Sequence, residues 1–393
     1  CPVDAVRQGQ TCQKHCIRSG KVPLNMYRNI VHVIAAIIFI LSLPWELQAE
    51  PRIQGVTGVV SEGERISISG SGFGPEGPMI LLFDDFEKGR NGAQISTAPG
   101  TAAVGNWDYT QLTVRYSSSF SHSGRNSLHS DWGSDGAAEG NRLAGKKLGG
   151  ATELFFSWWQ FVPVGAHVPG GGGPHGPNWK FFWLFGPRFP QSDYACVLIT
   201  DTLPPGYADY VGFGLKNDNN PPVRYVLGWI YPVEFKKGEW KRFDQYFKWG
   251  TSNNGHFGLW ELKSTGYHQW ADARNVTTGH EGEIWEHLNF PGYGRGDSNN
   301  AHTYYDDIYI ARGPGARARV EIGNKSNYSK CTNLAILTPT SWTDTQITAT
   351  VRQGAFMPGS KAYLFVIDAK GAISSGYPVT LVGSAGLTGS GRY

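Results

Sequence analysis

The chain has 393 residues, enough for two or three domains, and is rich in glycine (52) and in aromatic residues (13%). This composition predicts short strands joined by tight turns, and it argues against a mainly helical protein. The formal charge of +3 comes from the first 49 residues, which hold five of the 35 basic and two of the 32 acidic residues and so leave 30 of each. A neutral remainder lacks the electrostatic support that nucleic-acid binding needs, so no nucleic-acid partner is expected.

The apolar run at residues 30–43 follows Arg28 and precedes Ala49. A basic segment, a short apolar core and a small residue together predict a signal peptide over residues 26–49, with residues 1–25 untranslated. A membrane anchor is the alternative, but the run is shorter than the ~20 residues that a spanning helix needs. We therefore expect a secreted, periplasmic or cell-surface protein without a stable membrane span after cleavage.

Two segments at opposite ends of the remaining chain have the alternation of half-buried strands. Residues 65–69 alternate polar with apolar side chains and lead into the turn Gly-Ser-Gly-Phe-Gly at 70–74. Residues 342–351 begin with the turn Trp-Thr-Asp-Thr and continue as an alternating strand, and a further strand follows at 362–371. These motifs resemble the opening and closing halves of a TIG-type immunoglobulin-like domain. The resemblance implies one sandwich built from residues 50–80 and 316–383, followed by a flexible tail at 384–393. Two separate small modules are the alternative.

The segment between these halves, residues 81–315, begins and ends with similar strands. Residues 81–87 and 304–310 both alternate apolar residues with carboxylates, so we expect the first and last strands of one β-domain, paired or adjacent in space. Further strands are predicted at 153–161, 178–185, 210–216, 224–231, 239–248 and 257–262.

Four short motifs occur in order along this segment: Phe-Asp-Asp-Phe-Glu at 83–87, Asn-Trp-Lys at 178–180, Trp-Lys-Arg at 240–242 and Asp-Asp-Ile at 306–308. The order resembles concanavalin A-like jelly-rolls, among them polysaccharide lyases and sugar-binding sandwiches. The predicted fold class is therefore all-β, a concanavalin A-like jelly-roll inserted into, or flanked by halves of, a small immunoglobulin-like β-sandwich.

The resemblance implies that a sugar binds on one curved sheet face. In the strand at 239–248, Phe243 and Phe247 point one way, which we take as the core. The opposite face would present four polar residues to a polysaccharide: Arg242, Asp244, Tyr246 and Lys248. A solvated outer face is the alternative.

The strand at 178–185 offers a second set of polar contacts. If its all-aromatic side is core, Asn178 and Lys180 line the groove, and Arg224 joins them from the next strand. With Asp244 and Lys248 these residues make up the predicted substrate-binding set.

Cleavage of a uronate polymer would proceed by β-elimination, which needs a neutraliser for the carboxylate, a base and an acid. Arg242 is the first candidate for the neutraliser, with Arg224, Lys180 or Asn178 as alternatives. His175 is the predicted base, and Tyr246 the base or acid. An exposed loop histidine is the alternative for His175. Characteristic strand motifs of alginate lyases are absent, so the sequence leaves open whether the protein cleaves its ligand.

A glycosidase would need two carboxylates about 5–9 Å apart. The nearest substitutes are Glu281, Glu283 and Glu286, whose spacing indicates a loop or short helix. A cell-surface adhesion or structural protein without catalysis is a further alternative.

No cofactor is required by any of these interpretations. The acidic strand ends suit a structural Ca²⁺ held by Asp84, Asp85, Glu87 and Asp307; water-facing aspartates are the alternative. The partner expected is a polysaccharide, and the four polar residues side by side on the strand at 239–248 suit an anionic or a hydroxyl-rich ligand. The sequence leaves open the oligomeric state and any pairing of Cys196 with Cys331.

Overall fold

The computed structural model describes residues 50–111, 114–131, 139–141, 144–166, 178–187, 196–200, 210–217, 230–279, 284–290, 293–295 and 302–383. The backbone alone is described for residues 139–141, 178–181, 196–200, 210–217, 230–235 and 293–295. Regular structure in these ranges consists of strands and one 3-10 helix, η1 (Tyr328–Lys330). No helix in this part of the chain is long and apolar enough to cross a membrane. The predicted signal peptide and C-terminal tail lie outside the described residues.

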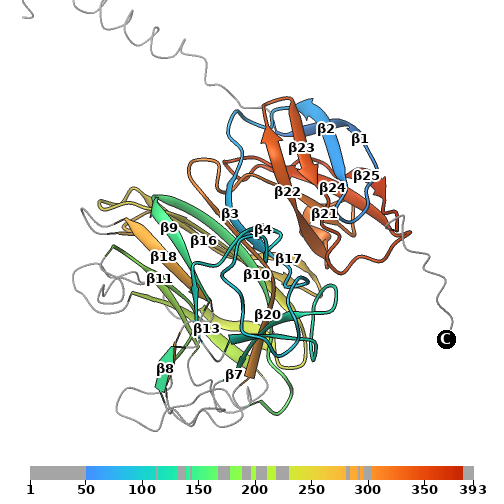
Figure 1. Ribbon diagram of the computed structural model, residues 1–393. Coiled ribbons are helices and arrows are strands. Elements are labelled where there is room, and N and C mark those ends of the chain that lie inside the picture. The colour runs from blue at the N-terminus through green and yellow to red at the C-terminus, as the bar shows by residue number, and fades with distance from the viewer. Residues whose placement is uncertain are drawn as a thin grey trace, which may run out of the picture. The chain divides into compact units, whose positions relative to one another are not determined.

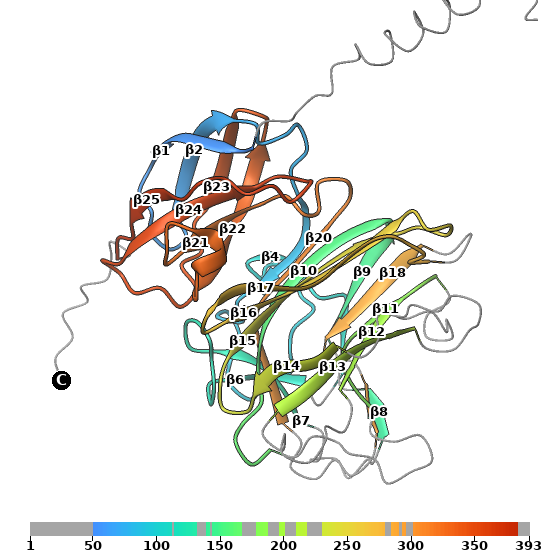
Figure 2. The ribbon, with the colours of Figure 1, turned by 180° about the vertical axis from the view of Figure 1, so that it is seen from behind.

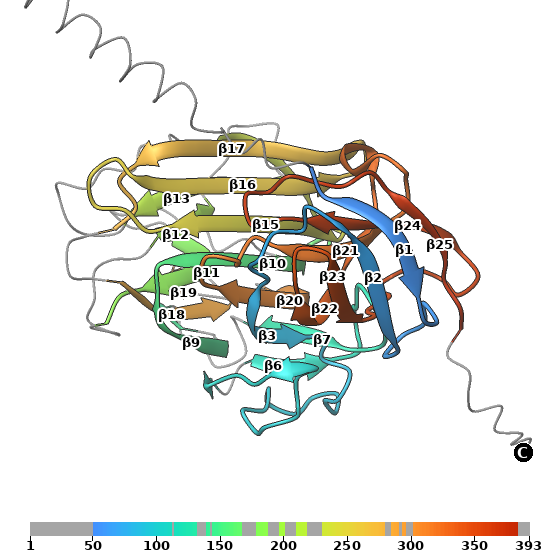
Figure 3. The same ribbon diagram turned by 90° about the horizontal axis from the view of Figure 1, so that it is seen from above.

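The first jelly-roll sheet contains the two acidic strands on which the sequence prediction depended. β20 (His302–Arg312) runs antiparallel to β3 (Met79–Asp84), with Ile308 opposite Asp84 and Ile310 opposite Leu82. The predicted pairing of these distant strands is confirmed. Figure 3 shows the order across the sheet from β17 (Gly266–Val276) through β16 (Gly255–Lys263), β15 (Lys241–Lys248), β10 (Glu153–Phe161) and β20 to β3. The short strand β4 (Val104–Gly105) pairs with the other edge of β3. β7 (Ser127–Asp131) also pairs with β20, and β6 (Val114–Ser117) with β7.

The second jelly-roll sheet lies against the first (Figure 2). Its order is β14 (Ile230–Lys236), β13 (Tyr210–Asn217), β12 (Cys196–Thr200), β11 (Asn178–Phe185), β18 (Trp285–Phe290), β9 (Ala144–Ala151) and β5 (Tyr109–Thr110). β19 (Tyr293–Arg295) extends it by pairing with β11 and with β8 (Glu139–Asn141).

The core between the two sheets is built from alternate residues of each strand. β10 and β15 contribute Trp158 and Phe243, whose ring centroids lie 5.5 Å apart, and β11 and β18 contribute Phe182 and Phe290 from the other side. The predicted inward direction of Phe243 and Phe247 is confirmed. Because residues of one parity fill this core, those of the other parity face outward on each sheet.

Strands from both ends of the described chain form a second β-sandwich, which we call the small sandwich (Figure 1). Its strand order is β1 (Arg52–Thr57), β2 (Arg65–Ser71), β23 (Gln346–Thr350), β22 (Leu334–Trp342), β21 (Arg319–Gly323), β24 (Lys361–Ile367) and β25 (Tyr377–Thr380). Ile68 lies opposite Ile347, and both are buried in one core. The jelly-roll is thus inserted into the small sandwich, which confirms the predicted fold class.

The two sequence motifs of the small sandwich hold each other in place. The backbone N–H of Gly74 donates to Oδ1 of Asp344 at 2.9 Å, and Nε1 of Trp342 donates to the carbonyl of Gly74 at 3.1 Å. A Cβ at Gly70 would lie 2.0 Å from the carbonyl oxygen of Arg52, so this close strand approach requires glycine.

Candidate functional site

The outer face of the first jelly-roll sheet is covered by the small sandwich, contrary to the prediction of a sugar groove there. Trp159 and Leu262 pack with Leu334 and Phe365 of the small sandwich. Arg242, predicted to neutralise a substrate carboxylate, is 1% exposed. Asp244, predicted to bind substrate, is 0% exposed. Both residues lie where the small sandwich packs on this face, and protein groups occupy their polar atoms, so both assignments are wrong.

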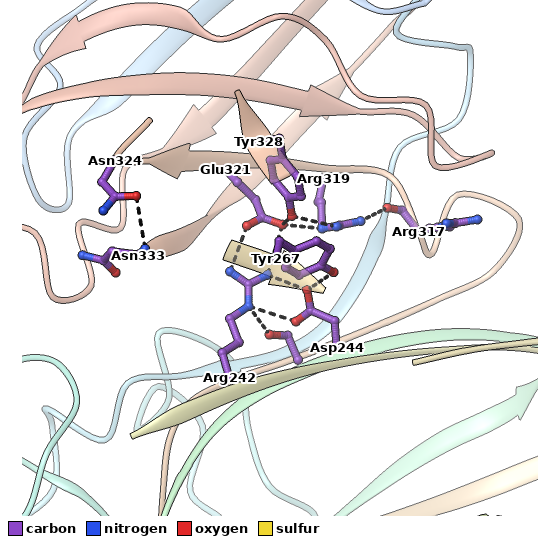
Figure 4. A network of polar contacts seen from close by, with 10 residues as sticks. Arg242, Asp244, Tyr267, Arg317, Arg319, Glu321, Asn324, Tyr328 and Asn333 are labelled. Carbon is purple, nitrogen blue, oxygen red and sulfur yellow. Dashed lines mark hydrogen bonds and ion pairs between the residues drawn. The ribbon is translucent and has the colours of Figure 1, made fainter. Parts of the chain in front are cut away.

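Both forks of the Arg242 guanidinium are occupied by protein carboxylates (Figure 4). Nε and Nη2 donate to Asp244 at 2.9 Å each, and Nη1 and Nη2 donate to Glu321 at 2.8 and 3.1 Å. Arg319 also donates to Glu321, and the Tyr267 hydroxyl donates to Asp244 at 2.6 Å. These charge-assisted pairs engage all three guanidinium nitrogens, so Arg242 joins the two sandwiches instead of binding a ligand.

The charges of this network stabilise one another inside the protein. Burial alone would raise the pKa of Glu321, but Arg242 and Arg319 lower it to about 2. Burial alone would lower the pKa of Arg242, but Asp244 and Glu321 raise it well above its ordinary value. Glu321, Arg242 and Arg319 therefore stay charged at neutral pH.

Tyr246 and Lys248, the other polar residues of β15, both contact Glu153. The Tyr246 hydroxyl donates to Glu153 Oε2 at 3.0 Å, and Lys248 Nζ lies 3.5 Å from Oε1. Burial, followed by the Glu153 charge, raises the pKa of Tyr246. The phenol therefore keeps its proton at neutral pH, so of the two roles predicted for Tyr246, base and acid, its state does not suit the base.

The remaining predicted groove residues lie at or beyond the edge of what is described. His175 and Arg224 lie outside the described residues, and Asn178 and Lys180 belong to β11 without described side chains. The predicted choice of faces on β11 is wrong, because Phe182 and Leu184 fill the core. The alternate side of the strand, with Trp183 and Phe185, faces outward.

The four carboxylates predicted to hold calcium have separate partners. Asp84 accepts from the backbone N–H of Phe86 at 2.9 Å and from Trp107 Nε1 at 2.7 Å, and burial raises its pKa to about 7. Asp85 accepts from the backbone N–H of Glu87 at 3.3 Å. The Glu87 side chain accepts from the backbone of Arg125 at 2.6 Å and of Asn126 at 2.7 Å.

Asp307, the fourth of these carboxylates, contacts His122 Nδ1 at 2.9 Å and accepts from Ser123 Oγ at 2.8 Å. Across the described ranges no group of three or more His, Cys, Asp or Glu side chains is arranged to hold a metal ion. The calcium site predicted from these residues is therefore not formed.

The outer face of the second jelly-roll sheet carries a row of residues that the sequence prediction missed. The backbone register places Tyr109 of β5 opposite Gly145 of β9, Gly145 opposite Asn289 of β18, and Asn289 opposite Trp183 of β11. The Tyr109 hydroxyl donates to Oδ1 of Asn289 across Gly145. A Cβ at Gly145 would lie 2.2 Å from the Tyr109 ring, so the glycine is what lets this ring reach Asn289.

The amide nitrogen of the Asn289 side chain, which carries two N–H donors, is unused by the described residues. The residue is 0% exposed, and its Nδ2 has no hydrogen-bond partner among the described residues. A buried amide donor left without a partner costs about 1–3 kcal/mol, so its position calls for a partner supplied from outside the described chain.

A second row lies beside the first on the same face. His287 of β18 is opposite Lys147 of β9 and Phe185 of β11. The His287 and Tyr109 ring centroids are 6.1 Å apart, and the Trp183 and Phe185 rings are 4.5 Å apart. Burial lowers the pKa of His287 and raises that of Tyr109, so the imidazole is neutral and the phenol protonated at neutral pH.

Asp108 fixes the edge on which Tyr109 stands. Its Oδ2 accepts from the backbone N–H of Lys147 at 2.7 Å and lies 2.9 Å from Lys146 Nζ, and its own N–H donates to the carbonyl of Gly145 at 2.9 Å. These three contacts anchor the two-residue strand β5 to β9.

A sequence signal for this site existed in His-Leu-Asn-Phe at 287–290, where two polar residues alternate with two apolar ones. The prediction instead treated the preceding Glu286 as part of a loop or short helix. Glu286 belongs to strand β18, and its Oε2 accepts from the backbone N–H of Gly150 at 3.1 Å. Glu281 and Glu283 lie outside the described residues.

No protein-family model matches the chain, and no curated protein does. Solved structures similar to it include an endo-β-1,4-glucuronan lyase from Trichoderma reesei, with 12% identity, TM-score 0.37 and coverage of 57% of this chain and 96% of that one. An alginate lyase, Aly36B, in complex with alginate tetrasaccharide, has 13% identity, TM-score 0.40 and coverage of 61% and 98%. A GH131 β-glucanase catalytic domain from Podospora anserina has 13% identity, TM-score 0.37 and coverage of 65% and 100%.

Proposed function

We propose that this protein binds a uronate-containing polysaccharide on the outer face of its second jelly-roll sheet and cleaves it by β-elimination. The observation that carries the proposal is the buried, unpartnered amide donor of Asn289, held beside the Tyr109 hydroxyl with His287 in the next row. A neutraliser, a base and an acid are the three groups that this reaction needs.

In this proposal the titratable groups start in the protonation states that their roles need. Asn289 Nδ2 donates to the substrate carboxylate and stabilises the charge that develops there when C5 loses its proton. His287, neutral because burial lowers its pKa, takes that proton. Tyr109, protonated at neutral pH because burial raises its pKa, donates its hydroxyl proton to the leaving oxygen.

The bond changes balance within this set of groups. The electron pair of the C5–H bond forms the C4–C5 double bond, and the C4–O bond breaks. The leaving oxygen gains the Tyr109 proton, and the proton held by His287 returns to the phenolate by way of solvent. The products are a chain with a new hydroxyl end and a chain with an unsaturated uronate end.

Trp183 supplies apolar surface for a sugar ring, and the buried Phe185 packs beside it. They lie on the two rows next to Asn289 and His287, and Trp183 is only partly buried. Aromatic faces that pack on the C–H faces of sugars would hold the polysaccharide while the polar residues bind its carboxylate.

Two further sequence interpretations accompany this proposal. We propose that the small sandwich is of the TIG type, because its Gly-Phe-Gly turn and its Trp-Thr-Asp segment contact each other. We also propose that the protein is exported, on the pattern of residues 26–49.

The test is incubation with a panel of uronate polymers, followed by ultraviolet absorbance of the unsaturated product. Tyr109→Phe and His287→Gln should each lower turnover by about 10²–10⁴-fold, and Asn289→Ala by about 10²–10³-fold. Tyr246→Phe, on the covered sheet, is the matched tyrosine control and should retain activity. Retention of the wild-type protein on immobilised polymer without product formation would refute cleavage and leave a binding protein.

A further inference from the structure

A cleft separate from the site above opens beside the first jelly-roll sheet. Its volume is about 520 Å³, within the range of small-ligand sites. One wall comes from Trp260, Tyr267 and Gln269 of β16 and β17, and Arg317 lies on the connection between β20 and β21. The opposite wall comes from the segment around η1 and from the connection between β24 and β25.

Arg317 differs from the neighbouring arginines in having no carboxylate partner among the described residues. Arg242 and Arg319 both pair with Glu321, whereas no Asp or Glu oxygen of the described residues lies within 4.0 Å of the Arg317 guanidinium. The hydrogen bond described for its side chain runs from Nη1 to the carbonyl of Lys370 at 3.0 Å. Figure 4 shows Arg317 pointing away from the carboxylates of the buried network.

The guanidinium is nonetheless held in a fixed position at the cleft. It lies over the rings of Trp260 and Tyr246, 5.0 and 5.4 Å from their centroids. A Cβ at Gly371 would lie 2.2 Å from its Cζ, so the absence of a side chain there makes room for it. Burial and the charge of Arg319 lower the pKa of Arg317, so a bound anion would stabilise its charge.

The opposite wall carries short polar side chains rather than apolar ones. Ser326, Asn327, Ser329 and Ser375 are exposed there, and Gln269 is exposed on the facing strand. Hydroxyl and amide groups of this kind match the hydroxyls of a sugar, and a fixed arginine matches a carboxylate.

We propose that this cleft is a second saccharide site, in which Arg317 binds the carboxylate of a uronate residue. This inference rests on the proposed function for its ligand class. It assigns to the cleft a part of the polymer other than the part that is cleaved, so it would increase retention of the polymer without taking part in the reaction.

The test uses the full chain carrying Asn289→Ala, which weakens the proposed catalytic site and leaves the cleft intact. Calorimetric titration with a uronate trisaccharide should still show binding. Adding Arg317→Ala should weaken that binding by at least ten-fold, since charge-assisted hydrogen bonds are lost. Arg317→Lys should weaken it less, and Lys330→Ala, which removes an exposed charge near η1, should have no effect.

Gly371→Ala provides a variant that keeps the arginine. The added methyl group displaces the guanidinium, so binding should fall although the charge is retained, while thermal unfolding confirms that each variant is folded. Equal affinity with and without Arg317 would overturn the proposal. Equal affinity for a neutral trisaccharide, an acidic tripeptide or inorganic phosphate would also overturn it, because the cleft would not select uronate. If the polymer panel shows no cleavage but Arg317→Ala still abolishes trisaccharide binding, the cleft stands without the proposed reaction.

Discussion

The buried network between the two sandwiches makes a quantitative prediction for Glu321→Gln. Glu321 accepts from both Arg242 and Arg319, so the substitution leaves two buried guanidinium groups with one remaining carboxylate, Asp244. Breaking a buried ion pair from one side typically costs about 3–5 kcal/mol. The lowering of the Glu321 pKa from 4.5 to about 2 corresponds to roughly 3 kcal/mol at neutral pH, which agrees with the lower end of that range.

Equilibrium unfolding in urea measures this loss directly. The free energy of unfolding of Glu321→Gln should fall by about 3 kcal/mol or more at pH 7. The stabilising effect of Glu321 is present above the ordinary carboxyl pKa and is lost as the pH falls from about 4.5 toward 2, so wild type and variant should converge there. A double-mutant cycle with Arg242→Met should give a coupling above about 1 kcal/mol.

Arg125→Ala is the control for this experiment, because Arg125 is 84% exposed and lies 3.8 Å from Glu87. Exposed pairs contribute little, so the control should stay within about 0.5 kcal/mol of wild type. A Glu321→Gln protein within about 1 kcal/mol of wild type would refute the view that this network holds the sandwiches together.

Two further predictions concern single side chains. Gly145→Ala should leave the fold intact but displace the Tyr109 ring, which lies 2.2 Å from the position of the added methyl group. Activity on the polymer should therefore fall by about 10²-fold, whereas the control Gly55→Ala, in the small sandwich, should retain it. His129 should titrate near pH 4 by NMR, because burial lowers its pKa and so does His302, whose Nδ1 lies 3.1 Å from His129 Nε2. Arg115 lowers the pKa of His129 further, whereas Asp131 raises it. Since its neutral form is favoured in the folded state, stability should decrease as the pH falls from about 6.5 to 4, and His129→Gln should abolish that part of the pH dependence.

The fold was predictable because its determinants are local patterns. Alternation of apolar and acidic residues identified β3 and β20, and the matching register of Asp84 and Ile308 followed from two similar strands closing one domain. The motifs at 70–74 and 342–345 likewise identified two halves whose contact the structure shows.

The site was harder to predict because it depends on which faces are covered. The sequence of β15 divides its residues correctly between two faces, but nothing in that strand indicates that the small sandwich covers Arg242 and Asp244. On β11 the more aromatic side was taken as core, whereas Phe182 and Leu184 occupy it. Tyr109 belongs to a strand of two residues, too short to give a periodic signal.

The insertion of one sandwich into the other has a consequence for synthesis on the ribosome. β2 leaves the ribosome early, but its neighbour β23 comes from the far end of the described chain, with Arg65 opposite Thr350. Until those residues emerge, the nascent chain carries an unpaired strand edge and a jelly-roll whose Arg242 lacks Glu321. The newly made protein must therefore pass through a stage with exposed, association-prone surface, which only its last strands remove.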